Sequence, residues 1–342
     1  MKALRYLGPK QLAVEELADP KPGSGEVLLR VRACGICGSD VHGYLGLTGR
    51  RLPPMTMGHE FSAEVVENGP GAEKFKPGDA VIVQPINFCG TCKNCREGQT
   101  NMCLNKKFFG VLDCDGAMAE YICVPEKQLY AMPVGCSYPV GALTEPFAVA
   151  YGSVKKAGLL KDKIVLIISA GTIGICMLQL IQLQKPKMLI VSDLSDARLA
   201  RAKALGADAV INPKKESFLD AVHRLTDGEM IQVSFEAVGV QASANQSIQC
   251  LKVGGRAVWV GMSQKEMQIN MQDVVCFARE ILGSFNYTHE EFGEVVELLG
   301  SGKMASSELI SRIVSLEEAP AAFEDLLQNP DTLLKIIIDP QR

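Results

Sequence analysis

The sequence predicts a fold of the α/β plus β class, in which a β-rich domain is combined with an α/β domain. The chain has 342 residues, enough for about two domains. Short apolar runs separated by Gly and Pro extend to about residue 135, and strand-like and helix-like segments alternate from about residue 164 to 284. Such alternation is typical of a parallel sheet with helices on both faces.

The β-rich part is divided by Pro–Gly turns at residues 22–23, 70–71 and 77–78, and we expect strands at 27–31, 63–66, 80–83 and 121–124. In the α/β part we expect strands at 165–168, 188–192, 209–211, 233–236, 256–260 and 281–283, with helices at 197–205 and 218–225. The tail predicts helices near 290–299 and 316–327 and a strand at 333–338. The expected segments are 1–144, 145–284 and 285–342.

Composition is that of an ordinary globular protein, with 47% hydrophobic and 22% charged residues and a net charge of -4. This balance argues against nucleic acid or an anionic membrane as a partner. The uncharged stretch 164–184 is interpreted as a buried strand and helix rather than a membrane span. No secretory signal is recognised, so we expect a cytoplasmic protein in which the 12 cysteines are thiols or metal ligands rather than disulfides.

The most specific local pattern is a cluster of four cysteines, Cys89, Cys92, Cys95 and Cys103, with C-x2-C-x2-C-x7-C spacing. Four thiolates so close together can surround one ion, and Zn²⁺ is the usual occupant of such a site. A site of this kind has no open position, so a structural zinc in a lobe at about 86–106 is predicted. An iron–sulfur cluster or four unrelated thiols are the alternatives.

A second cluster combines Cys37 with His59 and Glu60, and Glu145 follows just before the α/β part. Catalytic zinc takes about three protein ligands of mixed S, N and O type and keeps one open position. Two of the four histidines, His42 and His59, fall in this region. A catalytic metal is therefore predicted, and buried structural residues are the alternative. For Glu60 the further alternative is a carboxylate that orients a ligand.

The third pattern is a strand, a turn and a helix around Ser169, Gly171 and Gly174, with Asp193 at the end of the next strand. It matches the dinucleotide motif G-x-G-x-x-G only if Ser169 replaces the first glycine. Gly171 lets a pyrophosphate approach the helix N-terminus, and Asp193 accepts from both ribose hydroxyls and repels a 2′-phosphate. NAD is therefore favoured over NADP, although Arg198 can offset part of that repulsion. A flavodoxin-like sheet without a dinucleotide is the alternative.

These patterns, in this order, resemble the zinc-dependent medium-chain dehydrogenase/reductase family over the whole chain. The matching segments are 34–40 (CGICGSD), 58–61 (GHEF), 77–81 (PGDAV), 116–121 (GAMAEY), 254–258 (GGRAV) and the four-cysteine lobe. Ser169 and Ala117 depart from the usual pattern. Neither blocks binding on physical grounds, but a serine at position 169 can loosen the pyrophosphate turn.

The resemblance implies a GroES-like β-barrel catalytic domain, completed by the C-terminal segment, and a six-stranded Rossmann domain. It implies that Cys37, His59 and Glu60 or Glu145 bind the catalytic zinc, which gives two zincs per chain. The glutamate at position 145 makes the sequence similar to the sorbitol, threonine and galactitol-phosphate dehydrogenase group. The cofactor-binding residues are expected to be Ser169, Gly171, Thr172, Ile173, Gly174, Asp193, Arg198, Val238 and Val260.

The function predicted is a zinc-dependent hydride transfer between NAD and a secondary alcohol, with a polyol or sugar alcohol, phosphorylated or not, as the leading substrate class. Ser39 is hypothesised to take the alcohol proton and pass it through the cofactor ribose to His42. A turn hydroxyl and a surface histidine are the alternatives.

A threonine- or butanediol-type dehydrogenase, a metal-free reductase of activated double bonds and a catalytically silent zinc-stabilised binding protein remain open. The Arg50-Arg51 pair is interpreted as a solvated loop more readily than as an anion clamp. The segment 284–287 lies where the family pairs subunits, so we expect a homodimer or homotetramer.

Overall fold

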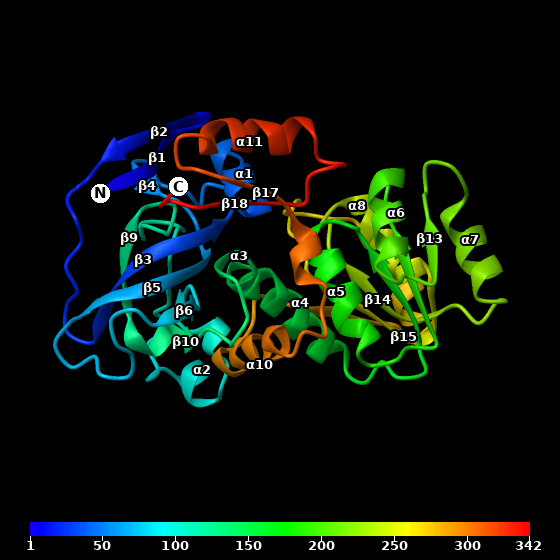
Figure 1. The fold of residues 1–342 in the computed structure, drawn as a ribbon. Helices are drawn as coiled ribbons and strands as arrows, with labels where there is room; N and C mark the ends of the chain where they lie inside the picture. Colours follow the sequence, from blue (N-terminus) through cyan, green and yellow to red (C-terminus); the bar gives the residue numbers. More distant parts are fainter. The chain divides into compact units, whose positions relative to one another are not determined.

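A computed structural model describes residues 1–342 of the chain. It divides into two compact units: unit 1 comprises Met1–Glu145 and Thr288–Arg342, and unit 2 comprises Pro146–Tyr287. Unit 1 is therefore built from both ends of the sequence, with unit 2 inserted between them (Figure 1). None of the helices is both long enough and apolar enough to cross a membrane.

Unit 1 contains three sheets. The largest has the order β10-β6-β5-β3-β18-β17, with β9 also paired to β3. Its strands are β3 (Glu26–Gly35), β5 (Glu60–Asn68), β6 (Ala80–Val83), β9 (Tyr121–Pro125), β10 (Leu129–Ala131), β17 (Ile310–Val314) and β18 (Lys335–Ile338). A second sheet has the order β2-β1-β4, from β1 (Lys2–Gly8), β2 (Gln11–Glu16) and β4 (Met55–Thr56), and β7 (Ile86–Asn87) pairs with β8 (Lys107–Phe108). These pairings do not show a closed barrel.

The C-terminal strands complete the main sheet of unit 1. β18 pairs antiparallel with β3, where Ile337 faces Gly35 and Ile338 faces Cys34, and β17 pairs parallel with β18. The sheet is therefore mixed, and residues from the last tenth of the chain enter the same core as the first strands. Phe61, Phe323 and Ile336 are buried together in that core.

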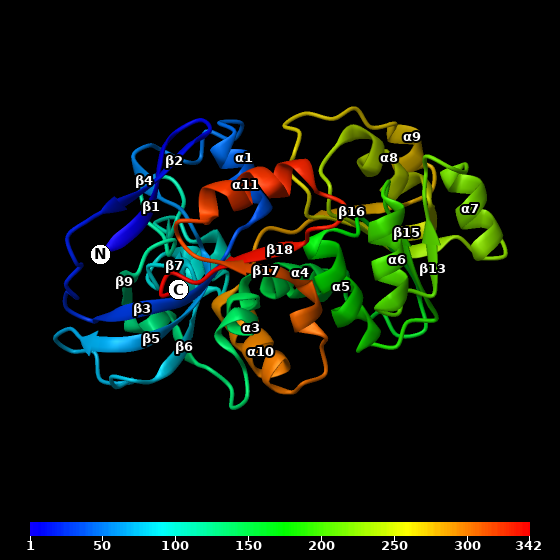
Figure 2. The same cartoon turned by 45° about the horizontal axis from the view of Figure 1, so that its top comes forward.

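The helices of unit 1 are mostly short. They are α1 (Gly38–Tyr44), α2 (Lys93–Arg96), α3 (Tyr138–Ala142), α10 (His289–Gly300) and α11 (Ala319–Gln328), together with the 3-10 turns Thr100–Met102, Glu126–Gln128 and Ser306–Leu309. α11 and α1 are neighbours, with the Phe323 ring 5.4 Å from that of Tyr44. Figure 2 shows α1 and α11 beside each other.

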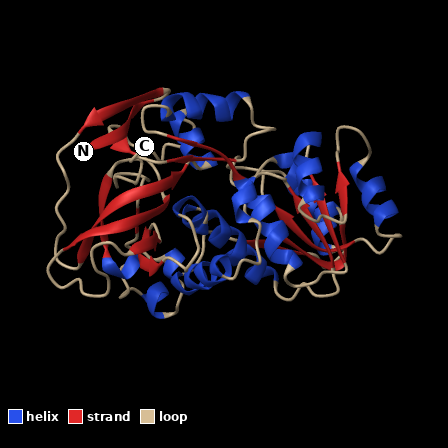
Figure 3. Cartoon of the chain, viewed as in Figure 1, coloured by secondary structure: helices blue, strands red, loops and turns tan.

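Unit 2 is a six-stranded parallel sheet in the order β13-β12-β11-β14-β15-β16. Its strands are β11 (Ile164–Ile168), β12 (Met188–Ser192), β13 (Ala209–Ile211), β14 (Ile231–Glu236), β15 (Leu251–Trp259) and β16 (Glu280–Gly283). Its helices are α4 (Thr144–Ala157), which begins in unit 1, α5 (Thr172–Gln182), α6 (Asp196–Ala204), α7 (Phe218–Leu225), α8 (Gln241–Gln249) and α9 (Met271–Val275). This strand order is that of the doubly wound dinucleotide fold, and Figure 3 shows the helices around its strands.

The strand and helix predictions are confirmed in position, with shifts mainly at element ends. The uncharged stretch 164–184 is a strand, β11, followed by a helix, α5, as expected. All five residues of β11 are buried, because a central parallel strand is covered on both faces. Among the elements that the sequence analysis did not name are β17, α1 and α4.

Candidate functional site

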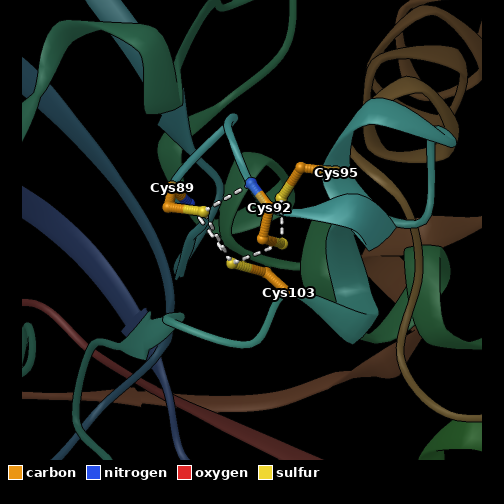
Figure 4. A group of neighbouring side chains, drawn as sticks. All are labelled: Cys89, Cys92, Cys95 and Cys103. Carbon is orange, nitrogen blue, oxygen red and sulfur yellow. Dashed lines mark hydrogen bonds between the residues drawn. The ribbon is translucent and has the colours of Figure 1, made fainter.

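The four cysteines of the lobe converge in unit 1 (Figure 4). Their sulfur atoms all lie within 4.8 Å of one another, with Cys92 3.5 Å from Cys95 and Cys89 3.5 Å from Cys103. Backbone N–H groups of Thr91 and Cys92 lower the pKa of Cys89 to about 5. Amide donors that stabilise a thiolate also favour metal ligation, because the thiolate is the ligand form of cysteine.

The second group brings Cys37, His59 and Glu60 together. Cys37 caps the N-terminus of α1, and its Sγ accepts the Ser39 N–H at 3.5 Å. His59 and Glu60 stand at the start of β5, where they are only 4% and 1% exposed. The sulfur, nitrogen and oxygen atoms of the three side chains lie within 4.8 Å of one another. A mixed donor set of this kind, with a half-buried thiol beside two buried side chains, fits a zinc ion with an open position.

Asp40, which the sequence analysis did not single out, supports this group. It is fully buried and accepts the Cys37 N–H at 3.1 Å and a guanidinium N–H of Arg51 at 2.7 Å. His59 Nδ1 lies 3.5 Å from the same carboxylate. Burial opposes ionisation, yet His59 and Arg51 hold the pKa of Asp40 well below its usual range. Asp40 is therefore a buried carboxylate that joins the cap of α1 to the imidazole.

The interpretation of Arg50-Arg51 as a solvated loop is correct for Arg50 and wrong for Arg51. Arg50 is exposed, but Arg51 is 5% exposed and directs its Nη2 at Asp40. The same nitrogen donates to Ser39 Oγ at 3.2 Å. Gly43 leaves room for this side chain, because a Cβ there would overlap Arg51 Cγ. The Arg51 guanidinium thus donates its hydrogen bonds to groups within unit 1 and does not form an anion clamp.

Lys335 is a second residue that the sequence analysis missed. It is 1% exposed, and its ammonium contacts both carboxylate oxygens of Glu60, at 2.9 and 2.6 Å. Burial lowers the pKa of Lys335, but the charges of Glu60 and Cys37 raise it by more than burial lowers it, so the net shift is upward. The available signal was a lysine at the first position of an otherwise aliphatic strand, because a lone charge in a core strand needs a partner.

The remaining predicted residues of unit 1 are placed as follows. Glu145 lies in the first turn of α4, is 5% exposed and is close enough to raise the pKa of Lys335, but it is not part of the group formed by Cys37, His59 and Glu60. Ser39 and His42 are exposed residues of α1, three positions apart and therefore on neighbouring turns of one face.

In unit 2, Ser169 directly follows β11 and begins the turn into α5. Its φ is +127°, a region that side-chain-bearing residues seldom adopt. Its Oγ accepts the Gly171 N–H at 3.1 Å, and its own N–H donates to Ser192 O at 2.9 Å. The expectation that Ser169 loosens the turn is therefore wrong, because the hydroxyl ties the turn together.

The glycine at the third motif position is required by close packing. A Cβ on Gly174 would overlap the carbonyl group of Ser169, since α5 starts directly against the end of β11. Gly171 caps the helix, and Thr172 and Ile173 form its half-buried first turn. A helix N-terminus presents backbone N–H groups to an anion, and small residues here let a phosphate approach them.

Asp193 follows β12 and is held by the same turn. Its oxygens accept the Ala170 N–H at 2.8 Å and the Ser195 N–H at 2.9 Å. Arg198 Nη1 stands 3.8 Å from the carboxylate, with side-chain exposures of 24% and 10% for the arginine and the aspartate. The carboxylate is thus fixed next to the turn, with one cation beside it.

The ends of β14 and β15 form the other part of this edge. Glu236 is buried and accepts the N–H groups of Val238 at 2.9 Å and Gly239 at 2.7 Å. Gly239 and Gly261 approach so closely that a Cβ on either would overlap the backbone of the other segment. Val238 and Val260 are therefore both at the carboxyl edge of the parallel sheet, where such folds bind ligands.

Comparison with known proteins defines the class. Residues 23–134 match the family described as alcohol dehydrogenase GroES-like domain, and residues 172–301 match the zinc-binding dehydrogenase family. Sorbitol dehydrogenase of Bacillus subtilis is 31% identical over 346 aligned positions, which cover 100% of this chain and 98% of the relative. L-threonine 3-dehydrogenase of Pyrococcus horikoshii is 36% identical over 90% of each chain.

A solved structure agrees with these matches. The protein of Sinorhizobium meliloti 1021, described as a zinc-binding dehydrogenase and bound to NADP, superposes with a TM-score of 0.91 at 31% identity over 99% of both chains. The chain belongs to the zinc-dependent alcohol dehydrogenases of the medium-chain dehydrogenase/reductase family. It is an enzyme that combines a GroES-like and a Rossmann-like domain with zinc and a nicotinamide cofactor.

Proposed function

We propose that this enzyme moves a hydride between NAD and the carbinol carbon of a secondary alcohol, with a polyol or sugar alcohol as its substrate class. The observation that carries the proposal is the group formed by the half-buried Cys37 and the buried His59 and Glu60. Thiolate, imidazole and carboxylate are the donors expected of a catalytic zinc, whereas the four-cysteine lobe is suited to a closed structural site.

The residues around the group fit a metal. His59 Nδ1 is buried and lies 3.5 Å from the Asp40 carboxylate. A carboxylate on one ring nitrogen favours metal ligation by the other. A zinc ion bound there supplies a Lewis acid that polarises the alcohol oxygen and lowers its pKa. Cys37, His59 and Glu60 are the proposed ligands, with Glu145 as the alternative or additional carboxylate, so that each chain holds two zincs.

Proton transfer is assigned to α1. Ser39 Oγ accepts one hydrogen bond from Arg51. This fixed donor restricts the directions in which the Ser39 O–H can point. The proposed role of Ser39 is to accept the alcohol proton as it gives up its own hydroxyl proton, and that of the exposed His42 is to release a proton to solvent. An imidazole exposed to solvent suits this step because it can take up a proton and release it to water.

Cofactor selection is assigned to Asp193. A carboxylate held by the Ala170 and Ser195 N–H groups is well placed to accept from ribose hydroxyls, and its charge disfavours a 2′-phosphate. Arg198 lies against this carboxylate and compensates part of that charge. We therefore propose NAD as the preferred cofactor, with a moderate rather than an absolute discrimination against NADP.

The substrate class rests on the carboxylates near the metal group and on the sorbitol dehydrogenase relative. An oxygen-rich zinc site suits a vicinal diol, which offers two oxygens to one ion. The L-threonine 3-dehydrogenase relative supports a second candidate, a threonine- or butanediol-type activity at the same site.

The test combines metal analysis with a substrate screen. The wild type should contain about two zincs per chain, and Cys37→Ser about one. NAD reduction is followed with sorbitol, other polyols, their phosphates, 2,3-butanediol and threonine, and NADP is run in parallel. Cys276→Ser is the matched control, since Cys276 is an exposed thiol outside both groups.

Three outcomes separate the candidates. Turnover of polyols that Cys37→Ser abolishes and Cys276→Ser retains supports the proposal. Turnover of threonine or butanediol alone moves the assignment to the second candidate. Two zincs in Cys37→Ser, or equal rates in both variants, would exclude metal-assisted hydride transfer at this site.

A further inference from the structure

The buried ion pair between Lys335 and Glu60 places a fixed cation inside the proposed metal site. An ammonium has three N–H donors, and all three are used here: two point at Glu60 Oε1 and Oε2, and one at Ile36 O at 3.0 Å. The side chains are 2% and 1% exposed, so solvent screens this pair very little.

The backbone holds Lys335 in this position. It is the first residue of β18, which pairs with β3 immediately before Cys37, and Ile36 N–H donates to Ile336 O at 2.9 Å. Gly35 leaves space for the pair, because a Cβ there would overlap Glu60 Oε2. The lysine stem is enclosed, so the ammonium stays with Glu60.

A metal and this ammonium require the same atoms. Both oxygens of Glu60 contact Lys335, and the same carboxylate lies within 4.8 Å of the donor atoms of Cys37 and His59. A divalent ion that binds a Glu60 oxygen therefore shares this carboxylate with the Lys335 ammonium. The two cations repel each other at close range in a poorly screened site.

We propose that Lys335 is a positioning residue that restrains Glu60 and limits how strongly this carboxylate binds the catalytic metal. The inference rests on the proposed function, because it requires metal at Cys37 and His59. Its consequence is a metal group that is one unit more positive than its ligands alone would make it. A site with that extra positive charge favours an anionic oxygen on the substrate.

The sign of the effect on metal affinity distinguishes this role from a structural one. Loss of a residue that only supports the fold would weaken zinc binding or leave it unchanged. Loss of a competing cation strengthens it. We expect Lys335→Met to lower the zinc dissociation constant of this site by about tenfold or more, as expected for a close, poorly screened charge.

The experiment measures zinc affinity by competition with a chromophoric chelator in the full-length protein. The variants are Lys335→Met, Lys335→Gln, Glu60→Gln and the double variant Lys335→Met/Glu60→Gln. Lys187→Met is the matched control, because Lys187 forms an exposed ion pair with Glu229 in unit 2. Circular dichroism verifies that each variant is folded, and Lys335→Gln provides a less disruptive neutral replacement.

Tighter zinc binding in Lys335→Met and Lys335→Gln, with a smaller gain when Lys335→Met is added to Glu60→Gln, supports the proposal. Affinity equal to or weaker than that of the wild type in both single lysine variants overturns it. The Cys37→Ser variant shows which of the two zinc sites the titration measures. If Cys37→Ser removes no metal, the proposed function fails at that step, whatever the result at Lys335.

Discussion

Arg51→Met should destabilise unit 1 strongly, whereas the adjacent Arg50→Met should not. The Arg51 and Asp40 side chains are 2% and 0% exposed, and their closest N–O distance is 2.7 Å. Removal of one partner from a buried pair costs about 3–5 kcal/mol, since the other charge remains buried without compensation. Asp40 keeps the Cys37 N–H and its proximity to His59, so we expect the lower part of that range.

The assay is urea unfolding of zinc-saturated protein, followed by far-ultraviolet circular dichroism. Hydrogen exchange of peptides from 26–68 assigns the change to unit 1. Tryptophan fluorescence would not do so, because the single tryptophan, Trp259, lies in unit 2. With an m value of about 1–3 kcal/mol/M, the loss corresponds to a midpoint shift of about 1 M or more. Zinc concentration is held constant, because bound metal itself stabilises the folded state.

The refuting result is specific. If Arg51→Met and Arg50→Met lower the midpoint by the same small amount, the buried pair contributes nothing measurable and Asp40 does not depend on it. Arg51→Lys refines the test, since it keeps the charge but loses the planar donor group that reaches Asp40 and Ser39 together. Its midpoint should fall between those of the wild type and Arg51→Met.

Three further predictions concern other contacts. Burial lowers the pKa of His289 below 6.5, so the stabilisation that the neutral imidazole contributes is present above that pH and is lost as pH falls below it. The difference in Tm between wild type and His289→Gln should therefore shrink from a pH of about 7.5 to about 5. A constant difference would contradict this. Gly174→Ala should abolish NADH binding in a fluorescence titration, while Gly283→Ala, with nothing within 4 Å, should not; equal affinities would contradict the close packing at the turn. Asp193→Ser should shift the NADP/NAD ratio of kcat/KM toward NADP by about tenfold or more, and an unchanged ratio would remove Asp193 from cofactor selection.

Local patterns were sufficient for most of unit 2. Three strands of the parallel sheet, β11, β12 and β13, are short and mainly aliphatic runs, so their composition agrees with the final structure. The dinucleotide turn was also predictable, because Gly171, Gly174 and Asp193 fall at the required spacings. The effect of Ser169 was not, since its φ and the contact of its hydroxyl with Gly171 depend on the turn geometry itself.

In unit 1 the sequence indicated both cysteine-containing groups, because ligand types and spacings are local features. Local patterns did not predict that β18 pairs with β3 or that β17 lies at the edge of the main sheet; only the family resemblance implied that the C-terminal segment completes this domain. Nor did the sequence distinguish Arg51 from Arg50, because two adjacent arginines in a polar loop carry no local signal about which one faces inward.

The residues that the sequence missed share one property: their partners are distant or depend on a turn of the backbone. Glu60 and Lys335 are separated by 275 positions, and Asp40 and Arg51 by 11. Each pair is buried beside a proposed zinc ligand, where an unpaired charge would be costly. A motif supplies the donor atoms of a metal group, but its charge is set by ion pairs that only the folded chain assembles. The electrostatic character of this site therefore depends on the C-terminal strand as much as on the segment that contains Cys37 and His59.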